Sequence, residues 1–253
     1  MKNLNEIIWL KRTDSTNDEL KRRICQLDNL SVVAALSQDN GRGQQGNSWS
    51  SEDGKNLLFS IALKTAEDSE GILEVYDHFA IGEMAALAVS DFLAQHGIQT
   101  AVKWPNDIYA GDRKICGILI ENSIRGNMIT RSIIGIGLNI NQRNFPITIP
   151  NPTSMALETQ KEYDLKDSLH EFMDIFRKYH DRYLNICGGL LKLHEMYCSQ
   201  MWRKDELSSF IDNTSGNTFQ GCIEGVSENG KIIIRKSDGE IYEFAFREIT
   251  YII

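Results

Sequence analysis

The stretch QDNGRGQQGNSW, residues 38–49, holds three glycines around one arginine and decides how the first half of the chain folds. Its centre, GRGQQG at residues 41–46, fits the dinucleotide fingerprint, but Asn47 stands where a P-loop needs lysine. Both motifs open a helix whose N-terminal amides face phosphates. Here the strand-like run 57–63 follows instead. We therefore predict a loop between two strands, whose glycines let the backbone approach an anion closely.

Two strands and a helix are predicted around this loop from the spacing of apolar residues. Residues 31–37, SVVAALS, predict a buried strand that ends just before the loop, and residues 57–63 predict its partner. Thr16 and Glu19 have capping-box spacing, which predicts a helix that begins near Ser15. The N-terminus of that helix is expected to face a site.

The middle of the chain alternates between helical and strand-like patterns. A long helix is predicted over residues 81–92, with Gly97 as its C-terminal stop. Short strands are predicted next, at residues 101–104, 114–121 and 130–141. Two further helices are predicted, over residues 169–183 and 190–201, with Gly188-Gly189 as the break between them.

Short strands return from about residue 207. Asn229-Gly230 and Asp238-Gly239 stand where two-residue hairpin turns are expected. Because a sheet of about 50 residues is marginal alone, we expect a small barrel packed against a larger α+β domain. The predicted domains are residues 1–206 and 207–253.

Composition excludes several classes of protein. A formal charge of -8 in 253 residues argues against a general nucleic-acid-binding surface, which needs clustered Lys and Arg. The apolar run near the start, residues 7–10, is too short for a signal peptide, and no later apolar stretch is long enough to span a bilayer. Five cysteines without CxxC spacing indicate neither a disulfide framework nor a zinc site, so we expect a reducing cytoplasm.

Polar clusters at the ends of the predicted strands indicate a binding site. Ser15, Thr16, Asn17 and Gln38 are small neutral donors and acceptors, which suit an uncharged ligand such as a urea or amide ring. Each cluster alone has an ordinary structural explanation. A Ser-Thr-Asn run, for example, commonly caps a helix. Their presence together in one domain favours the functional interpretation.

Three cations form the other half of the predicted site. Arg42, Lys103 and Lys114 could hold a carboxylate and an ATP α-phosphate together and so allow an acyl-adenylate to form. Asn106 and Asp107 offer oxygen ligands for Mg²⁺ beside the phosphates.

Two further residues are considered for the nucleotide end of this site. Trp49 offers a flat face for adenine. Asn139, taken alone, is better explained by a turn than by a ligand contact.

The order and wording of these motifs resemble the biotin protein ligases. The matching segments are STN at 15–17, QDNGRGQQGNSW at 38–49, KWPNDI at 103–108, RKICGILIE at 113–121 and GIGLNIN at 135–141. The resemblance implies a class II synthetase-like catalytic domain with a mixed sheet flanked by helices, followed by an SH3-like barrel. It also implies an activity: biotin and ATP give biotinyl-5′-AMP, with Mg²⁺, and a lysine of a biotin carboxyl carrier protein then accepts the biotinyl group.

The resemblance also implies roles for individual residues. Lys114 and Arg42 would be catalytic. The biotin-binding residues would be Ser15, Thr16, Asn17, Gln38, Arg42, Gly43, Gln44, Lys114 and Gly117. The nucleotide-binding residues would be Trp49, Lys103, Asn106, Asp107 and Asn139, with Asp107 as metal ligand.

Two departures from the family pattern qualify these expectations. The family usually has a basic residue where Gln44 stands, so we expect the adenylate to be held less tightly. The STN motif is reached by residue 15, which leaves no room before it for the DNA-binding domain of the dual ligase-repressors. We therefore expect no DNA or membrane partner, and we leave homodimerisation open.

Two alternatives remain at this point. A lipoate or octanoate transferase of the same superfamily would share the glycine loop and sometimes uses a cysteine nucleophile, for which Cys116 is the candidate. The other is a biotin-sensing module without catalysis, against which Lys114 and Arg42 argue.

Overall fold

The computed structural model describes residues 6–65, 73–184 and 188–252. Its larger sheet has seven strands in the order β1-β2-β3-β7-β6-β5-β4, with β1 parallel to β2 and the other pairs antiparallel. The strands are β1 Ile7–Leu10, β2 Val32–Ala35, β3 Leu57–Lys64, β4 Ala101–Lys103, β5 Asp107–Ala110, β6 Arg113–Arg125 and β7 Met128–Leu138. The predicted mixed sheet is confirmed, and the glycine loop does connect two of its strands.

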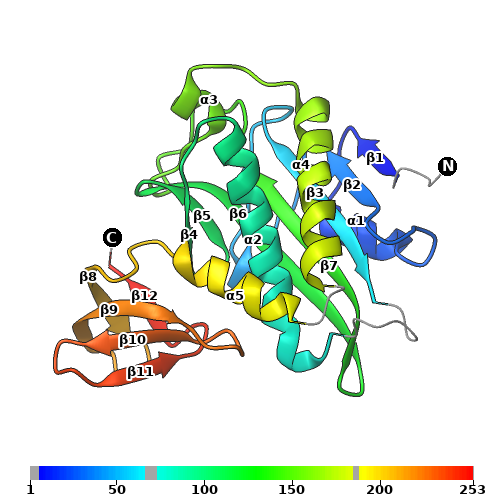
Figure 1. Ribbon diagram of the computed structural model, residues 1–253. Helices are drawn as coiled ribbons and strands as arrows, with labels where there is room; N and C mark the ends of the chain where they lie inside the picture. Colours follow the sequence, from blue (N-terminus) through cyan, green and yellow to red (C-terminus); the bar gives the residue numbers. More distant parts are fainter. Residues whose placement is uncertain (1–5, 66–72, 185–187, 253) are drawn as a thin grey trace.

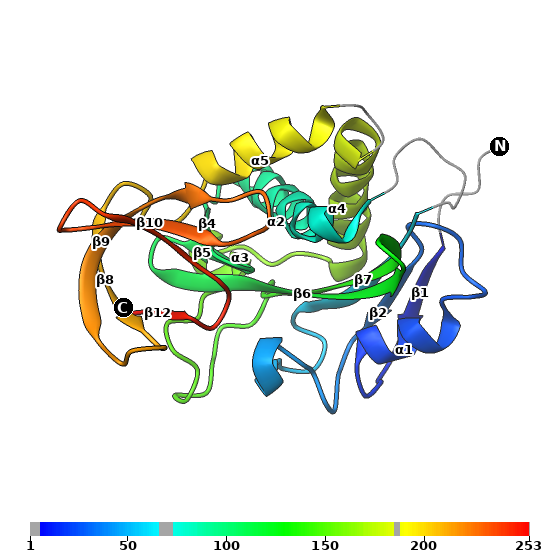
Figure 2. The same cartoon turned by 90° about the horizontal axis from the view of Figure 1, so that it is seen from below.

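Helices cover the two faces of this sheet unequally (Figures 1 and 2). Helices α2, α4 and α5 lie on one face, and α1 lies on the other together with the loop that follows β2. The helical segments are α1 Thr16–Arg23, η1 Gln44–Gly46, η2 Val75–Asp77, α2 His78–Gln95, α3 Met155–Thr159, α4 Leu165–Tyr179, the π-helical turn η3 His180–Leu184 and α5 Gly189–Ser199. Among the described helices, none combines the length and the apolar character needed to cross a membrane.

The main core lies between the sheet and helices α2 and α4. Phe59 of β3, Phe92 of α2 and Phe172 of α4 are fully buried and meet edge to face. Gly97 follows α2 with φ +79°, so the predicted helix stop is confirmed. This core therefore covers one face of the sheet and leaves the opposite face to α1 and the glycine loop (Figure 2).

Helix α1 covers only part of the opposite face. Leu20 and Ile24 of α1 pack on Val33 of β2, whose neighbours Val32 and Ala34 point into the main core. Helix α1 also packs on Ile133 of β7. The candidate site lies beside α1 on this face, over Gly117 of β6 and Gly137 of β7.

The predicted capping box of α1 does not form. Ser15 is the N-cap, but its side chain makes no capping hydrogen bond. Gln38 Oε1 accepts the Thr16 N–H instead, at 2.7 Å. Glu19 pairs with Arg22 and Arg23, chiefly Arg22, which lowers its pKa. A carboxylate gains more from a guanidinium than from a neutral backbone amide, so Glu19 turns away from the helix start.

The C-terminal sheet has five antiparallel strands in the order β11-β10-β9-β8-β12. They are β8 Leu207–Asp212, β9 Thr218–Val226, β10 Ile232–Lys236, β11 Ile241–Phe244 and β12 Ile249–Tyr251. Gly230 and Gly239 take positive φ in the two predicted hairpins, although both connections are longer than two residues. The domain boundary at residues 206 and 207 stays a prediction.

Candidate active site

A cavity of about 400 Å³ lies beside α1 on that face of the larger sheet, a size typical of small-molecule sites. Of the predicted site residues, those that line it are Ser15, Thr16, Asn17, Gln38, Arg42, Gly43, Gln44, Trp49, Lys103, Asn106, Asp107, Lys114 and Gly117. Asn139 is not among the lining residues. The fold therefore brings together residues separated by as much as a hundred positions in the chain.

Three glycines form the floor of this cavity. Gly117 of β6 pairs with Gly137 of β7, and a Cβ at Gly137 would lie 2.4 Å from Cε2 of Trp49. A Cβ at Gly135 would lie 2.3 Å from Oδ1 of Asn17. The indole and the amide can lie against the sheet only because these positions have no side chain. Gly135 and Gly137 were not among the predicted site residues, although two glycines at positions i and i+2 of a strand were a usable signal.

The neutral end of the cavity is a hydrogen-bonded network. The Ser60 hydroxyl of β3 lies 2.8 Å from Thr16 Oγ1 and 2.6 Å from Asn17 Oδ1. Asn17 Nδ2 donates to Glu121 Oε2 at 2.8 Å. Ser60, Thr16 and Asn17 are all buried, so their orientation is determined by these contacts. No sequence pattern singles out Ser60, because it lies within an apolar strand.

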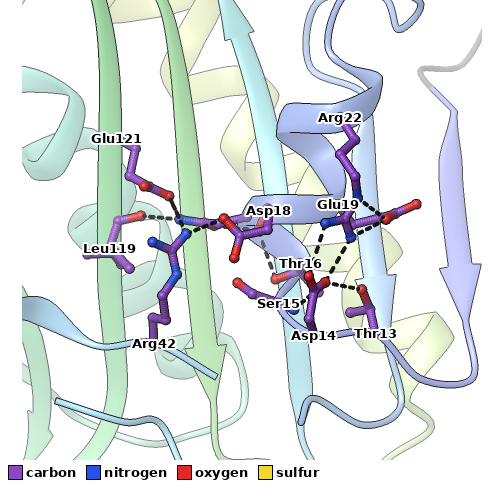
Figure 3. A network of polar contacts seen from close by, with 12 residues as sticks. Thr13, Asp14, Ser15, Thr16, Asp18, Glu19, Arg22, Arg42, Leu119 and Glu121 are labelled. Atoms are coloured by element: carbon purple, nitrogen blue, oxygen red, sulfur yellow. Dashed lines mark hydrogen bonds and ion pairs between the residues drawn. The ribbon is translucent and has the colours of Figure 1, made fainter. Parts of the chain in front are cut away.

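Arg42 extends this network toward helix α1 (Figure 3). Its guanidinium donates to Asp18 Oδ1 at 2.7 Å and to Glu121 Oε2 at 3.1 Å. Two carboxylates therefore balance its charge. A ligand anion that uses Arg42 has to compete with both of them.

Lys103 and Lys114 supply positive charge at the other end. Lys114 Nζ lies 2.7 Å from Asp107 Oδ1 and 5.6 Å from the centre of the Trp49 ring. Lys103 Nζ lies over the Tyr251 ring, at 4.7 Å from its centre. Burial lowers the pKa of Lys103; Asp107 opposes this and Lys114 adds to it. Two lysines share one carboxylate, so an added anion would be stabilised here.

A β-bulge places Lys114 on the cavity side. In regular alternation, Lys114 and Gly117 would point to opposite faces of β6, because they are three residues apart. The pairing with β5 shifts between Ile108 and Tyr109, so that Ile108 pairs with Cys116 and Tyr109 with Lys114. The extra residue, Ile115, is buried in the main core. The bulge thus re-aims Lys114 toward Asp107.

The C-terminal sheet closes one wall of the cavity. Phe246, Ile249, Thr250 and Tyr251 line it. The Tyr251 hydroxyl is buried and has no hydrogen-bond partner within the described chain, and burial raises its pKa. These residues were not predicted, because local patterns do not show where a small sheet docks.

Asn106 and Asn139 both support the backbone around the cavity. Asn106 Nδ2 donates to the Ile118 carbonyl at 2.6 Å, and Asn139 Nδ2 donates to the Thr153 carbonyl at 2.9 Å. The Thr153 N–H in turn donates to the Lys114 carbonyl at 2.9 Å. Asn139 therefore positions the segment beside Lys114, and its contact with a nucleotide stays a prediction.

The donor set near the lysines fits a magnesium ion that arrives with phosphates. Asp107 offers one carboxylate in the cavity, and Mg²⁺ commonly uses one or two protein carboxylates together with phosphate oxygens and water. In the described ranges, no group of three or more His, Cys, Asp or Glu is arranged to hold a metal ion by itself. Asp107 would have to share its oxygens between Lys114 and the ion.

Cys116 does not have the environment of a nucleophile. Its side chain is fully buried, and burial raises the pKa of the thiol. Its Sγ contacts the Gly117 carbonyl at 3.8 Å. Because the reactive form of cysteine is the thiolate, this position disfavours acyl transfer through Cys116.

Comparisons with known proteins identify relatives of this chain. Biotin–protein ligase 1, chloroplastic, of Arabidopsis thaliana is 26% identical over 243 residues, which are 94% of this chain and 64% of that protein. The chain thus spans less than two thirds of that relative. A biotin–acetyl-CoA-carboxylase ligase of Paracoccus denitrificans is 26% identical over 235 residues, 91% of this chain and 94% of that one.

Solved structures and family models extend the likeness. The biotin protein ligase of Aquifex aeolicus, solved in complex with biotin and ATP, has a TM-score of 0.77 and 26% identity over 97% of both chains. The model of the Biotin/lipoate A/B protein ligase family matches residues 9–139, more than half of the chain. The resemblance noted from the motifs is confirmed: this chain belongs to the biotin/lipoate A/B protein ligase family.

Proposed function

We propose that this protein is an ATP-dependent biotin protein ligase, which forms biotinyl-5′-AMP and transfers the biotinyl group to a lysine of a biotin carboxyl carrier protein. One observation carries the proposal: a single cavity joins the neutral network of Thr16 and Asn17 to the lysine pair, Lys103 and Lys114. The first part suits a ureido ring and the second suits a carboxylate beside a phosphate. The Aquifex aeolicus relative, solved with biotin and ATP, supports the choice of ligands.

In the first step, a biotin carboxylate oxygen attacks the α-phosphorus of ATP and pyrophosphate leaves. Two unit charges about 4 Å apart repel by about 4 kcal/mol at an effective dielectric constant of about 20. Lys114 is the cation best placed to offset this repulsion, because the bulge directs it into the cavity beside Asp107. Lys103, partly desolvated under Tyr251, would add a second positive charge near the phosphates.

In the second step, the amine of the carrier lysine attacks the acyl carbon of the adenylate and AMP leaves. The glycine loop would cover the adenylate between the two steps. Arg42 would take part by exchanging Asp18 and Glu121 for the ligand's anionic groups.

Gln44 is the residue most relevant to retention of the adenylate. It lines the cavity, and its Oε1 is buried without a hydrogen-bond partner in the described chain. A neutral amide supplies a hydrogen bond but no charge, so the anionic intermediate would be held less tightly than by arginine.

The test is incubation of the protein with ATP, Mg²⁺, biotin and a carrier domain, followed by intact-mass detection of the biotinyl adduct. Lipoate in place of biotin is the parallel reaction. A carrier modified only by lipoate, or a carrier left unmodified while adenylate accumulates, would contradict the proposal.

A further inference from the structure

Outside the cavity, three side chains that can exchange protons lie in a row beside the C-terminal sheet. Glu83 of α2 is 2% exposed, and its Oε1 lies 2.6 Å from Nδ1 of His194 in α5. The other ring nitrogen, Nε2, lies 3.6 Å from Sγ of Cys198, one helical turn further along. A carboxylate, an imidazole and a thiol in this order form the arrangement that activates cysteine nucleophiles.

The charges around this row favour a protonated imidazole. Hydrogen bonds with Cys198 and with Glu83 raise the pKa of His194 to about 10. Burial raises the pKa of Glu83, and the hydrogen bond with His194 opposes that effect. The imidazolium therefore persists at neutral pH, with its Nε2 3.6 Å from Sγ of Cys198.

The surroundings of Cys198 come from its own helix, α5, and from β9. Tyr197 of α5 is buried, and its hydroxyl donates to the Pro105 carbonyl. From β9, the nearby groups are backbone: a Cβ at Gly225 would lie 3.7 Å from Sγ, and the Val226 carbonyl lies 3.9 Å from it. The positive charge that Sγ meets is therefore that of His194.

We propose that Cys198, His194 and Glu83 form an activated thiol site, which is modified by hydroperoxides and by small alkylating electrophiles. Cys198 is half-buried, so small molecules can reach Sγ while larger ones are hindered. The site does not depend on the ligase function proposed above. None of its three residues lines the active-site cavity.

The oxidation is a two-electron transfer. The thiolate sulfur attacks one oxygen of the hydroperoxide, an S–O bond forms and the O–O bond breaks. Sulfur is oxidised to the sulfenic acid, the peroxide is reduced, and the departing alkoxide takes the proton of His194 to leave as an alcohol. The new oxygen would occupy the contact between α5 and β9, in a sheet whose residues 246–251 reach the active-site cavity.

The first test compares two thiols in the full chain. The protein is reacted with limiting iodoacetamide at pH 7, folded and in urea, and alkylated peptides are quantified by mass spectrometry. Cys222 of β9 is the matched thiol, because it is also half-buried and has no histidine contact among the described residues. Folded Cys198 should react about ten times faster than Cys222 or more, and urea should bring the ratio to about one. A folded ratio near one would overturn the proposal.

Variants test the mechanism of activation. His194→Gln and Glu83→Gln should each slow alkylation of Cys198 by about tenfold without changing Cys222, and Cys198→Ser confirms the peptide assignment. An unchanged alkylation rate of Cys198 in folded His194→Gln overturns the proposal. If this variant does not fold, the comparison of folded and urea-unfolded wild-type protein still tests the proposal. In the oxidation arm, tert-butyl hydroperoxide followed by dimedone should label Cys198; labelling of Cys222 alone would reject it.

Discussion

The substitution Gly135→Ala tests whether the floor of the cavity holds Asn17 in place. A Cβ at this position would lie 2.3 Å from Asn17 Oδ1 and 2.9 Å from its Cγ. To reach ordinary contact, the amide must move by about 1 Å. That movement breaks the hydrogen bonds from Ser60 to Oδ1 and from Nδ2 to Glu121.

The magnitude follows from these two bonds. A neutral hydrogen bond contributes about 1 kcal/mol and one to a carboxylate about 2 kcal/mol, so their loss costs about 3 kcal/mol. Replacement of glycine restricts the unfolded chain and returns up to about 1 kcal/mol. The free energy of unfolding should therefore fall by about 2 kcal/mol. If Asn17 contacts biotin, the affinity for biotin should fall about 10- to 100-fold.

Urea denaturation and calorimetric titration with biotin measure these two effects. Gly82→Ala in α2 is the matched control, because its Cβ would meet Ile120 Cδ1 at an ordinary 3.6 Å. That helix should gain up to about 1 kcal/mol, with biotin binding unchanged. A folded Gly135→Ala protein with the stability and biotin affinity of the wild type would refute the role assigned to the glycine floor.

Four further outcomes follow from the same site. Lys114→Ala should keep the fold yet form adenylate at least about 10²-fold more slowly, and near-normal pyrophosphate release would contradict its role. Gln44→Arg should slow adenylate dissociation about tenfold by adding a charge-assisted hydrogen bond; equal or slower release from the wild type would defeat that reasoning. Burial lowers the pKa of Lys103, so this lysine loses its positive charge at a lower pH than an ordinary lysine does. As the pH rises, kcat/KM for ATP should therefore begin to fall below the pKa of an ordinary lysine. Lys103→Arg should move this limb up by about one pH unit or more, and a superimposable profile would exclude Lys103 as the titrating group. Tyr251→Phe should raise the KM for ATP about fivefold without loss of stability in urea, because the hydroxyl has no partner among the described residues; a destabilised variant would show that it does.

Most elements could be predicted from the sequence because they are determined locally. The strands on either side of the glycine loop follow from apolar runs, and the stop of α2 follows from Gly97, which takes the left-handed conformation. The prediction failed at the start of α1, where Glu19 had two nearby arginines to pair with instead of a backbone amide. Spacing indicates that a capping box is possible, but competition between partners decides whether it forms.

The residues of the candidate site could be predicted from the sequence, but their arrangement in space could not. That Lys114 and Gly117 share the cavity depends on the bulge opposite Ile108 and Tyr109, which alternation along β6 does not show. Gly135 and Gly137 were visible as glycines in a strand, but only the structure shows that Asn17 and Trp49 lie against them.

The sequence by itself determined most of the longer helices and strands, the glycine loop between strands and the family to which the chain belongs, because periodicity, turn residues and motifs are local properties. Strands β1 and β5 and helix α3 were not predicted. Only the tertiary structure decided that Arg42 meets Glu121, that Tyr251 closes the cavity and that His194 of α5 meets Glu83 of α2. These contacts join residues from different elements. They depend on strand register and on how helices and sheets pack, which no local pattern specifies.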